Sequence, residues 1–470
     1  RMSLGLKPKP IDDGALLENI ISNIKNNKNK NYESSLNYFT YAYMYMGGGI
    51  SIGDINNDQL PDIYFTGNMV PNKLYLNKGD MTFEDISERA GVSGDHRWYT
   101  GTTMTDINND GLLDIYVSVS GKFSPRNNQL FINNGDLTFT ESAANYGLDA
   151  DEEIIQTTFF DYDQDGDLDA FLANYPSTSF RTPNIKYQFL KYDKDLKKSD
   201  RLLEQRADGT FKDVTETAGI LNFGLTISAS IADFNNDGFE DIYVSNDFST
   251  PDFLYINNGN GYFEERPFEL SDSEPLTYCT YSLTLADMNN DGYLDLISSN
   301  GVDTDVLTPW GFEESHEGSG TIIFYNNRNG NFTSTSEIIG TSTTFSSIHT
   351  DVNDDGLPDL ILGQMGREIE VYIQGSNNRF TLYPSMTQTG RGLWMGMAIG
   401  DYNVDSDWNL YATNQGLSTF FCGYDNFSQQ LSNDETKMMV SLPNFENSDE
   451  REDVLHSLNP FHSIFDFDFS

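Results

Sequence analysis

The sequence predicts an all-β protein, a β-propeller of seven blades. A nine-residue pattern, Asp-x-Asn/Asp-x-Asp-Gly-x-x-Asp, recurs along the chain, and its copies start 50 to 72 residues apart. A period near 50 residues, lengthened by insertions, is typical of a four-stranded blade. Stretches with the alternation of strands flank each copy, whereas helical periodicity is scarce. The copies start at Asp54, Asp106, Asp161, Asp233, Asp287, Asp351 and, in a weaker seventh form, Asp401.

Four strand-like stretches recur in each repeat. The first precedes the nine-residue pattern and the second follows it, as in residues 62–65 and 114–117. The third ends in an Asn-Gly turn, as in 130–135, and these residues tolerate the positive φ angles of hairpins. The fourth carries an aromatic residue, namely Phe83, Phe139, Phe211, Phe263 or Phe332. Four strands in each of seven repeats give seven blades.

The repeats divide the chain into three parts. We assign residues 47–430 to the propeller, with insertions near 174–206 and 300–320. Residues 1–46 form an N-terminal extension with a short helix and an aromatic segment suited to close the ring. Residues 431–470 form an acidic tail rich in Asn and Ser. We expect this tail to pack along a partner, such as a second copy of the chain, because its composition alone favours disorder.

Composition excludes some functions. Acidic residues outnumber basic ones by 72 to 28, which gives a formal net charge of −44. Nucleic-acid binding requires a basic surface, so we exclude it. No run of about 18 apolar residues is present, so we expect no membrane span in this chain. Two cysteines, Cys279 and Cys422, are too few for a disulfide framework, and they either pair or remain free. A bound cation would relieve the self-repulsion of so acidic a chain.

The nine-residue pattern has the ligands of a calcium loop. Calcium takes about six to eight oxygen ligands. Side chains at positions 1, 3 and 5 of a tight loop converge, glycine at position 6 permits the turn, position 7 offers its carbonyl, and a carboxylate at position 9 completes the shell. We therefore predict Ca²⁺ between the first two strands of each blade. The predicted ligands of the first six loops are Asp54, Asn56, Asp58, Leu60, Asp62, Asp106, Asn108, Asp110, Leu112, Asp114, Asp161, Asp163, Asp165, Asp167, Asp169, Asp233, Asn235, Asp237, Phe239, Asp241, Asp287, Asn289, Asp291, Tyr293, Asp295, Asp351, Asn353, Asp355, Leu357 and Asp359.

Two loops depart from the pattern. Gln59 replaces the turn glycine of loop 1, which we expect to strain the backbone without removing a ligand. Loop 7 offers Asp401, Asn403 and Asp405, but it lacks glycine and ends in Asn409, so we expect it to bind weakly or stay empty. EF-hand loops also begin in this way, but they close with Glu at position 12, which none of these loops has. Ordinary surface turns use Asp and Gly as well. Six near-complete copies in the same phase favour a metal site.

Calcium dependence suggests where the protein works. Extracellular calcium modules bind with dissociation constants of about 10⁻⁴–10⁻³ M, whereas cytosolic calcium is scarce. We therefore expect a secreted or cell-surface protein. Its five histidines are scattered, and no catalytic motif is present. We expect a binding or adhesion module with a protein or glycan ligand, not an enzyme. Two alternatives remain open, a structural subunit of an extracellular filament or surface complex that assembles through its terminal segments, and a propeller-based polysaccharide lyase or glycosidase.

The repeats resemble a known family. The loops and hairpins are similar to the FG-GAP/VCBS repeats of integrin α-chain propellers. Residues 47–58, 72–77 and 83–91 more specifically resemble the opening blade of cartilage-acidic-protein-like (CRTAC-type) proteins, and residues 396–401 resemble the closing one. The resemblance implies a seven-bladed propeller with calcium loops, secretion or surface display, and adhesion or ligand binding on the face opposite the loops. A C-terminal module frequent in that family is not found after residue 430.

Overall fold

The computed structural model describes the chain from residue 48 onward, with gaps. The described residues are 48–79, 82–95, 97–121, 125–177, 195–247, 250–267, 269–271, 274–275, 280–300, 320–328, 330–334, 339–340, 343–353, 355–383, 392–400, 409–414 and 461–466. They form two compact units, which are described separately. Of the described residues, those between 35 and 298 and between 322 and 336 belong to the five-sheet unit, and those between 299 and 321 and after 336 belong to the second unit.

The first five repeats each form an antiparallel sheet of four consecutive strands. The first sheet has β1 (Ile50–Gly53), β2 (Asp62–Phe65), β3 (Lys73–Asn77) and β4 (Phe83–Asp85), and the second has β5 (Trp98–Thr105), β6 (Asp114–Ser120), β7 (Gln129–Asn133) and β8 (Phe139–Glu141). The third has β9 (Ile154–Phe160), β10 (Asp169–Asn174), β11 (Arg201–Gln205) and β12 (Phe211–Asp213). The fourth has β13 (Thr226–Ala232), β14 (Asp241–Asn246), β15 (Phe253–Asn257) and β16 (Phe263–Pro267), and the fifth has β19 (Thr280–Ala286), β20 (Asp295–Asn300), β21 (Thr321–Asn326) and β22 (Phe332–Ser334). A small hairpin of β17 (Glu269–Ser271) and β18 (Glu274–Pro275) lies between the last two sheets in sequence.

The second unit contains the strands of the last two repeats. β23 (Thr344–Thr350), β24 (Asp359–Arg367), β25 (Glu370–Gln374) and β26 (Phe380–Leu382) follow the same order as in the earlier sheets. The far end of β24 also pairs with β27 (Gly392–Gly400), which pairs with β28 (Asn409–Asn414). β28 in turn pairs with β29 (Phe461–Asp466). Six residues of the tail therefore lie in this sheet, whereas the sequence-based division placed the whole of 431–470 outside the repeats.

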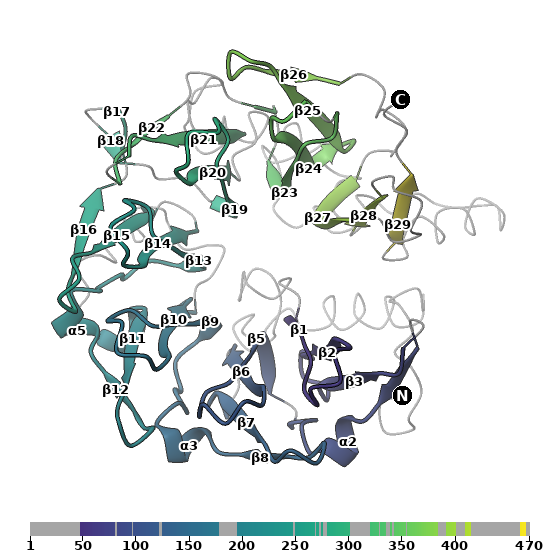
Figure 1. Cartoon of the computed structure of the whole chain (residues 1–470), viewed down its shortest axis with the longest axis vertical. Coiled ribbons are helices and arrows are strands. Elements are labelled where there is room, and N and C mark those ends of the chain that lie inside the picture. Colours follow the sequence, from purple (N-terminus) through teal and green to yellow (C-terminus); the bar gives the residue numbers. More distant parts are fainter. Residues whose placement is uncertain are drawn as a thin grey trace, which may run out of the picture. The chain divides into compact units, whose positions relative to one another are not determined.

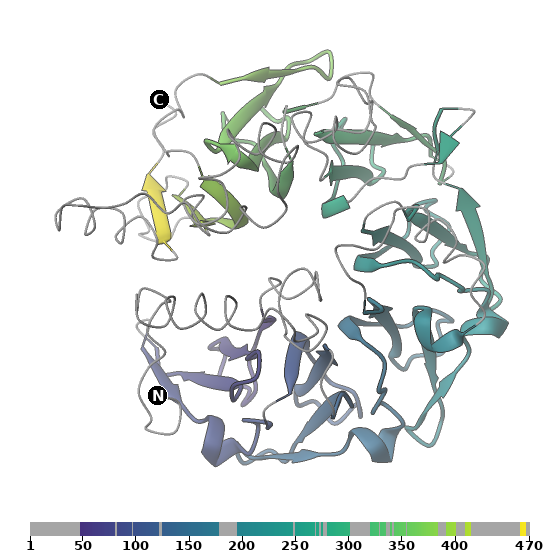
Figure 2. The ribbon, with the colours of Figure 1, turned by 180° about the vertical axis from the view of Figure 1, so that it is seen from behind.

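The first strands of successive sheets lie side by side in the five-sheet unit. β1 contacts β5, β5 contacts β9, β9 contacts β13 and β13 contacts β19, while β8, β12 and β16 lie at the far edges of their sheets (Figures 1 and 2). Glycine permits this approach, because a Cβ atom on Gly101 would lie 2.6 Å from the carbonyl oxygen of Ile155. The apolar core fills the space between neighbouring sheets, as in the cluster of Tyr64, Leu74, Ile115 and Val117.

One-turn helices join three of the sheets to the next first strand. They are α2 (Ser87–Ala90), α3 (Ala143–Tyr146) and α5 (Thr215–Ala218), and each ends at a glycine with φ between 75° and 79°. Sequence analysis did not predict them, although a Gly directly after such a segment is a usual C-terminal signal. No helix in the described part of the chain is long and apolar enough to cross a membrane.

The aromatic residues that predicted the fourth strands agree with the structure. Each described fourth strand up to repeat 5 begins at the aromatic residue named above. The insertion near 174–206 is shorter than expected, because Arg201–Gln205 is the regular third strand of its sheet. Among the described residues of the insertion, Leu196–Lys198 forms a 3₁₀ turn (η5) before that strand. The extension 1–46, most of the segment 300–320, and both cysteines lie outside the described residues.

Candidate metal-binding loops

The first six loops fold in the same way. In every one, the backbone N–H of position 5 donates to the side-chain oxygen of position 1 at 2.9–3.1 Å and to that of position 3 at 2.9–3.3 Å. The position 1 carboxylate also accepts from the N–H of position 6 at 2.6–3.0 Å. The position 5 carboxylate accepts from the N–H of position 7 at 2.9–3.1 Å. The structure therefore brings positions 1, 3 and 5 together in all six.

Two residues in each of loops 1 to 5 have left-handed backbone. The glycine at position 6 has φ between 85° and 98° in loops 2 to 6, and Gln59 takes the same region in loop 1 with φ of 70°. The strain expected at Gln59 is thus located at its backbone. Position 4 is also left-handed, at Asn57, Asn109, Gln164, Asn236 and Asn290, with φ of 56–60°. Sequence analysis missed this second position, although the Asn at four of these five sites tolerates it.

The aspartate at position 9 is part of the fold as well as of the loop. Asp62, Asp114, Asp169, Asp241, Asp295 and Asp359 each expose at most 1% of their surface. One carboxylate oxygen accepts from the N–H of position 2 at 2.9–3.2 Å. The other accepts from the N–H of the last residue of the third strand at 2.7–2.8 Å. Position 9 therefore ties its loop to the second and third strands of the sheet.

The charged form of these position 9 carboxylates is disfavoured, which raises their pKa. Burial, with a further contribution from the acids at positions 1 and 5, raises the pKa of Asp114 and Asp295 to about 6 and that of Asp241 to about 7. In loop 3, burial and the nearby acids Asp163 and Asp167 raise the pKa of Asp169 to about 8. The two backbone N–H groups at each site act in the opposite direction but do not compensate. A bound cation would stabilise the charged carboxylates and lower their pKa.

Loop 3 has the densest acidic cluster among the described residues. One carboxylate oxygen from each of Asp161, Asp163 and Asp169 lies within 4.8 Å of the others. Oxygens bound to one calcium ion at about 2.3–2.6 Å are at most about 5 Å apart, so these three fit a single ion. Asp167 carries a further carboxylate, one oxygen of which is buried without a hydrogen-bond partner. The donor set is entirely oxygen, which suits a hard cation.

An amide at the end of the third strand connects each of repeats 2 to 5 to the repeat before it. Asn133, Gln205, Asn257 and Asn326 donate their side-chain N–H to the position 2 carbonyl of the preceding loop, in Ile55, Ile107, Tyr162 and Phe234 respectively, at 2.6–2.9 Å. We name these four groups the bridging amides. They were not predicted from the sequence. Their signal is a constant spacing, because each lies six residues before the aromatic residue that begins the fourth strand.

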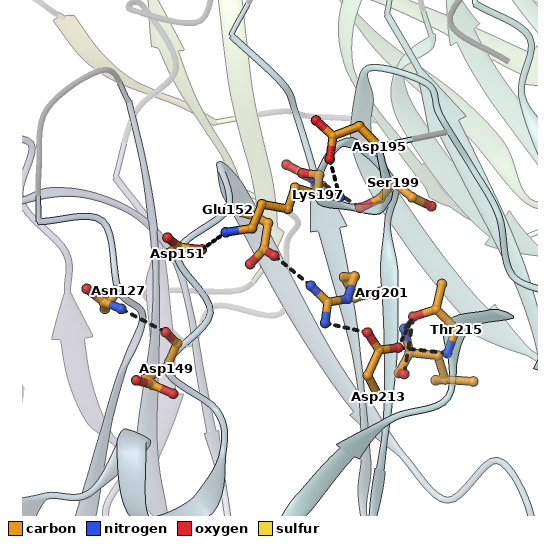
Figure 3. Close-up of polar contacts among 12 residues, drawn as sticks. Asn127, Asp149, Asp151, Glu152, Asp195, Lys197, Ser199, Arg201, Asp213 and Thr215 are labelled. Carbon is orange, nitrogen blue, oxygen red and sulfur yellow. Dashed lines mark hydrogen bonds and ion pairs between the residues drawn. The ribbon is translucent and has the colours of Figure 1, made fainter. Parts of the chain in front are cut away.

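A second polar cluster lies at the opposite ends of the strands, around repeats 2 and 3. Figure 3 shows Arg201 of β11 between Glu152 and Asp213, and Lys197 beside Asp151. Arg201 contacts Glu152 at 2.6 Å, and the Glu152 side chain is only 5% exposed. The insertion near 174–206 thus places these two cations against acids of the connection that precedes β9. Residues 178–194, which hold the other lysines of that insertion, lie outside the described residues.

Comparison with known proteins identifies the repeats. The model of the FG-GAP-like repeat matches residues 27–117, 118–172, 193–244, 233–298 and 351–412. The chain belongs to the FG-GAP-like repeat family. It is 30% identical to cartilage acidic protein 1 of Xenopus tropicalis over 218 residues and 29% identical to the human protein over 220 residues. The matched regions are 46% of this chain and 31% of each relative, so the FG-GAP chain spans about a third of the length of these relatives.

Two solved structures of BBS1N in complex with ARL6DN, soaked with mercury or with lead, also resemble the FG-GAP chain. Each match covers 79% of this chain. The first has 13% identity, a TM-score of 0.42 and 91% coverage of the solved chain, and the second has 12% identity, a TM-score of 0.38 and 90% coverage. The family comparison confirms the resemblance to FG-GAP/VCBS repeats and to cartilage-acidic-protein-like proteins. The predicted ligands Asp401, Asn403 and Asp405 of loop 7 lie outside the described residues.

Proposed function

We propose that this FG-GAP protein is a calcium-stabilised extracellular propeller of seven blades that acts as a binding or adhesion module. The observation that carries the proposal is the shared geometry of loops 1 to 6. In each loop the same hydrogen bonds gather positions 1, 3 and 5. Folding six acidic loops into one conformation concentrates like charges, and bound cations would offset that cost.

Calcium would be held by the side chains at positions 1, 3, 5 and 9 and the carbonyl at position 7. In this arrangement Ca²⁺ supplies positive charge and a fixed coordination sphere that orders each loop. At millimolar calcium, a site with a dissociation constant near 10⁻⁴ M stabilises the folded state by about 1.4 kcal/mol. Several such sites together would make the fold dependent on extracellular calcium. This dependence, with the relationship to cartilage acidic protein 1, supports a secreted or cell-surface location.

Calcium titration of protein stripped with EGTA tests the proposal. We expect isothermal titration calorimetry to show about six ions per chain and the melting temperature to rise by many degrees at 2 mM calcium. Asp165→Ala should remove about one ion, because it deletes an exposed ligand of loop 3 without touching the core. Magnesium at the same concentration is the control, since its smaller octahedral shell fits such loops poorly. Absence of binding at 10 mM calcium would refute calcium stabilisation.

The location and partner require separate tests. Surface proteolysis of intact producing cells, with a cytosolic marker as control, should cleave the protein if it is displayed or secreted. Light scattering of the full chain and of a variant that lacks residues 431–470 tests self-assembly through the tail. An array of glycans and matrix proteins, probed with and without calcium, tests the binding role. Turnover of a polysaccharide on the same array would instead favour the lyase or glycosidase alternative.

A further inference from the structure

The bridging amides form part of a continuous hydrogen-bond path through the five-sheet unit. The Asn133 side chain donates to Ile55 O of loop 1, and the Asn133 N–H donates to Asp114 of loop 2. Asp114 also accepts from the N–H of Ile107, whose carbonyl accepts from Gln205 of the next repeat. The Gln205 N–H donates to Asp169 of loop 3, which also accepts from the N–H of Tyr162, whose carbonyl accepts from Asn257. The path continues in the same way from Asn257 to Asp241 of loop 4, and from there through Asn326 to Asp295 of loop 5. Each link joins position 9 of one loop to position 2 of the loop before it.

A second contact joins some of the same loops at their tips. The Asn57 side chain, at position 4 of loop 1, donates to the carbonyl of Gly111, at position 6 of loop 2, at 3.1 Å. The Gln164 side chain of loop 3 donates in the same way to the carbonyl of Gly238 in loop 4. Position 6 is the turn residue on which convergence of the acidic side chains depends. Loops 1 and 2, and loops 3 and 4, are thus connected at the exposed tip as well as at the buried base.

We propose that the bridging amides couple the loops, so that calcium bound in one loop raises the calcium affinity of the next. The proposal rests on the proposed calcium binding. An ion that orders loop 3 fixes Asp169 and hence the end of β11, which carries Gln205. Gln205 then holds the position 2 carbonyl of loop 2 at 2.9 Å. By thermodynamic linkage, loop 2 must influence loop 3 to the same degree.

Gln205 offers the clearest test. Its side-chain amide contacts loop 2, whereas Asn133, Asn257 and Asn326 also donate to the position 8 carbonyl of their own loop at 3.1–3.2 Å. Gln205→Met keeps the side-chain volume and the backbone N–H that donates to Asp169. It removes the link to Ile107 alone. In protein with five other loops intact, Asp165→Ala empties loop 3.

Hydrogen exchange of residues 106–114, measured against calcium concentration, reports the occupancy of loop 2. In the wild-type background, Asp165→Ala should raise the half-saturating calcium concentration of loop 2 roughly three- to tenfold, the range that one hydrogen bond supports. In the Gln205→Met background, Asp165→Ala should change the half-saturating calcium concentration of loop 2 less than twofold. An equal change in both backgrounds, or none in the wild type, overturns the coupling.

A second pair of variants serves if Gln205→Met does not fold. Asn133→Ala removes the bridge to loop 1 together with the contact to Leu113 O, while Asn77→Ala removes the equivalent contact to Pro61 O in repeat 1. Asn133→Ala should weaken the coupling between loops 1 and 2 by up to the same three- to tenfold effect, because the contact of Asn57 with Gly111 O remains, and Asn77→Ala should leave the coupling unchanged. Binding of six independent ions would refute coupling and leave the proposed function standing. Absence of calcium binding would refute both.

Discussion

The buried carboxylate of Asp252 accepts a 2.8 Å hydrogen bond from the hydroxyl of Tyr243. It also accepts from Asn246 N at 2.7 Å and from the Thr280 hydroxyl at 2.8 Å. All three donors are uncharged, and burial raises the pKa of Asp252 to about 7. In repeat 2 the same position holds Asn128, which accepts from Val119 N and donates to the Tyr116 hydroxyl, both at 2.8 Å. An amide therefore satisfies this position without a titrating group.

Replacement of Asp252 by Asn should remove a pH-dependent term from stability. The pKa of this carboxyl is higher in the folded state than the ordinary value of 3.8, so the folded protein retains a proton that the unfolded chain releases. The stability that this proton contributes is complete below pH 4 and is lost as the pH rises through 7. We expect Asp252→Asn to be more stable than the wild type at pH 8, by roughly 2–4 kcal/mol.

Urea unfolding at pH 5, 6, 7 and 8 in saturating calcium measures this difference. Other carboxyls of raised pKa in the loops also make stability depend on pH. Because both proteins contain them and both are measured in saturating calcium, their contribution cancels in the difference between Asp252→Asn and the wild type. Asp136→Asn, at an exposed turn, is the matched control and should follow the wild type. If the Asp252→Asn and wild-type curves ran parallel from pH 5 to 8, Asp252 would not titrate in this range.

Position 9 and position 5 of the same loop should respond differently to alanine. Asp114 is fully buried and accepts two backbone hydrogen bonds, whereas Asp110 is exposed. Asp114→Ala leaves two buried N–H groups unpaired, which costs about 2–4 kcal/mol with or without calcium. Asp110→Ala should destabilise the protein in calcium only. Urea unfolding in 2 mM calcium and in EGTA separates the two, and an Asp114→Ala protein as stable as the wild type in EGTA would contradict the structural role.

Two of the ion pairs in Figure 3, Arg201–Glu152 and Lys197–Asp151, should differ in strength. Arg201 is 19% exposed and contacts Glu152, which is 5% exposed, whereas Lys197 and Asp151 are 66% and 53% exposed. Arg201→Met would leave Glu152 buried without its cation, at a cost of about 3 kcal/mol. Lys197→Met should cost less than about 0.5 kcal/mol because water screens that pair. Thermal unfolding compares them, and Glu152→Gln in the Arg201→Met background should restore part of the stability. Equal effects of Arg201→Met and Lys197→Met would show that burial is unimportant here.

The periodic features of this chain could be predicted from sequence because they depend on local chemistry. The nine-residue pattern marks the turn between the first two strands, so β2, β6, β10, β14, β20 and β24 each begin at its last aspartate. The aromatic residue then marks the fourth strand. Both signals require only neighbouring residues, since turn geometry and strand alternation are short-range properties.

The contacts between repeats could not be predicted in the same way. Gln205 bonds to Ile107, 98 residues earlier, and nothing in the residues around Gln205 indicates that partner. Asp200 and Asp252 resemble surface acids in sequence, although they expose 0% and 4% of their surface. A regular spacing does mark them, because Asn72, Asn128, Asp200 and Asp252 each lie eleven residues before a fourth-strand Phe (83, 139, 211 and 263). Variable loops between the second and third strands hide this spacing when it is counted from the nine-residue loops.

Loop 1 should gain stability from the glycine that it lacks. Gln59 has φ of 70°, and its N–H donates to Asp54 at 2.6 Å, so it occupies the turn position that glycine holds in loops 2 to 6. Left-handed backbone costs a non-glycine residue about 1–2 kcal/mol, while glycine loses about 0.5–1 kcal/mol more entropy on folding. The balance favours Gln59→Gly by up to about 1 kcal/mol.

The reverse substitution in loop 2 is the matched control for this change. Gly111 has φ of 85°, and a Cβ atom there would meet no other atom within 4 Å, so Gly111→Gln introduces backbone strain without a clash. It should destabilise the protein by about as much as Gln59→Gly stabilises it, and it should weaken calcium binding at loop 2 because strain opposes the converged geometry. Urea unfolding and calcium titration measure both variants. If Gln59→Gly destabilised the protein while Gly111→Gln had no effect, the turn at position 6 would not limit the stability of these loops.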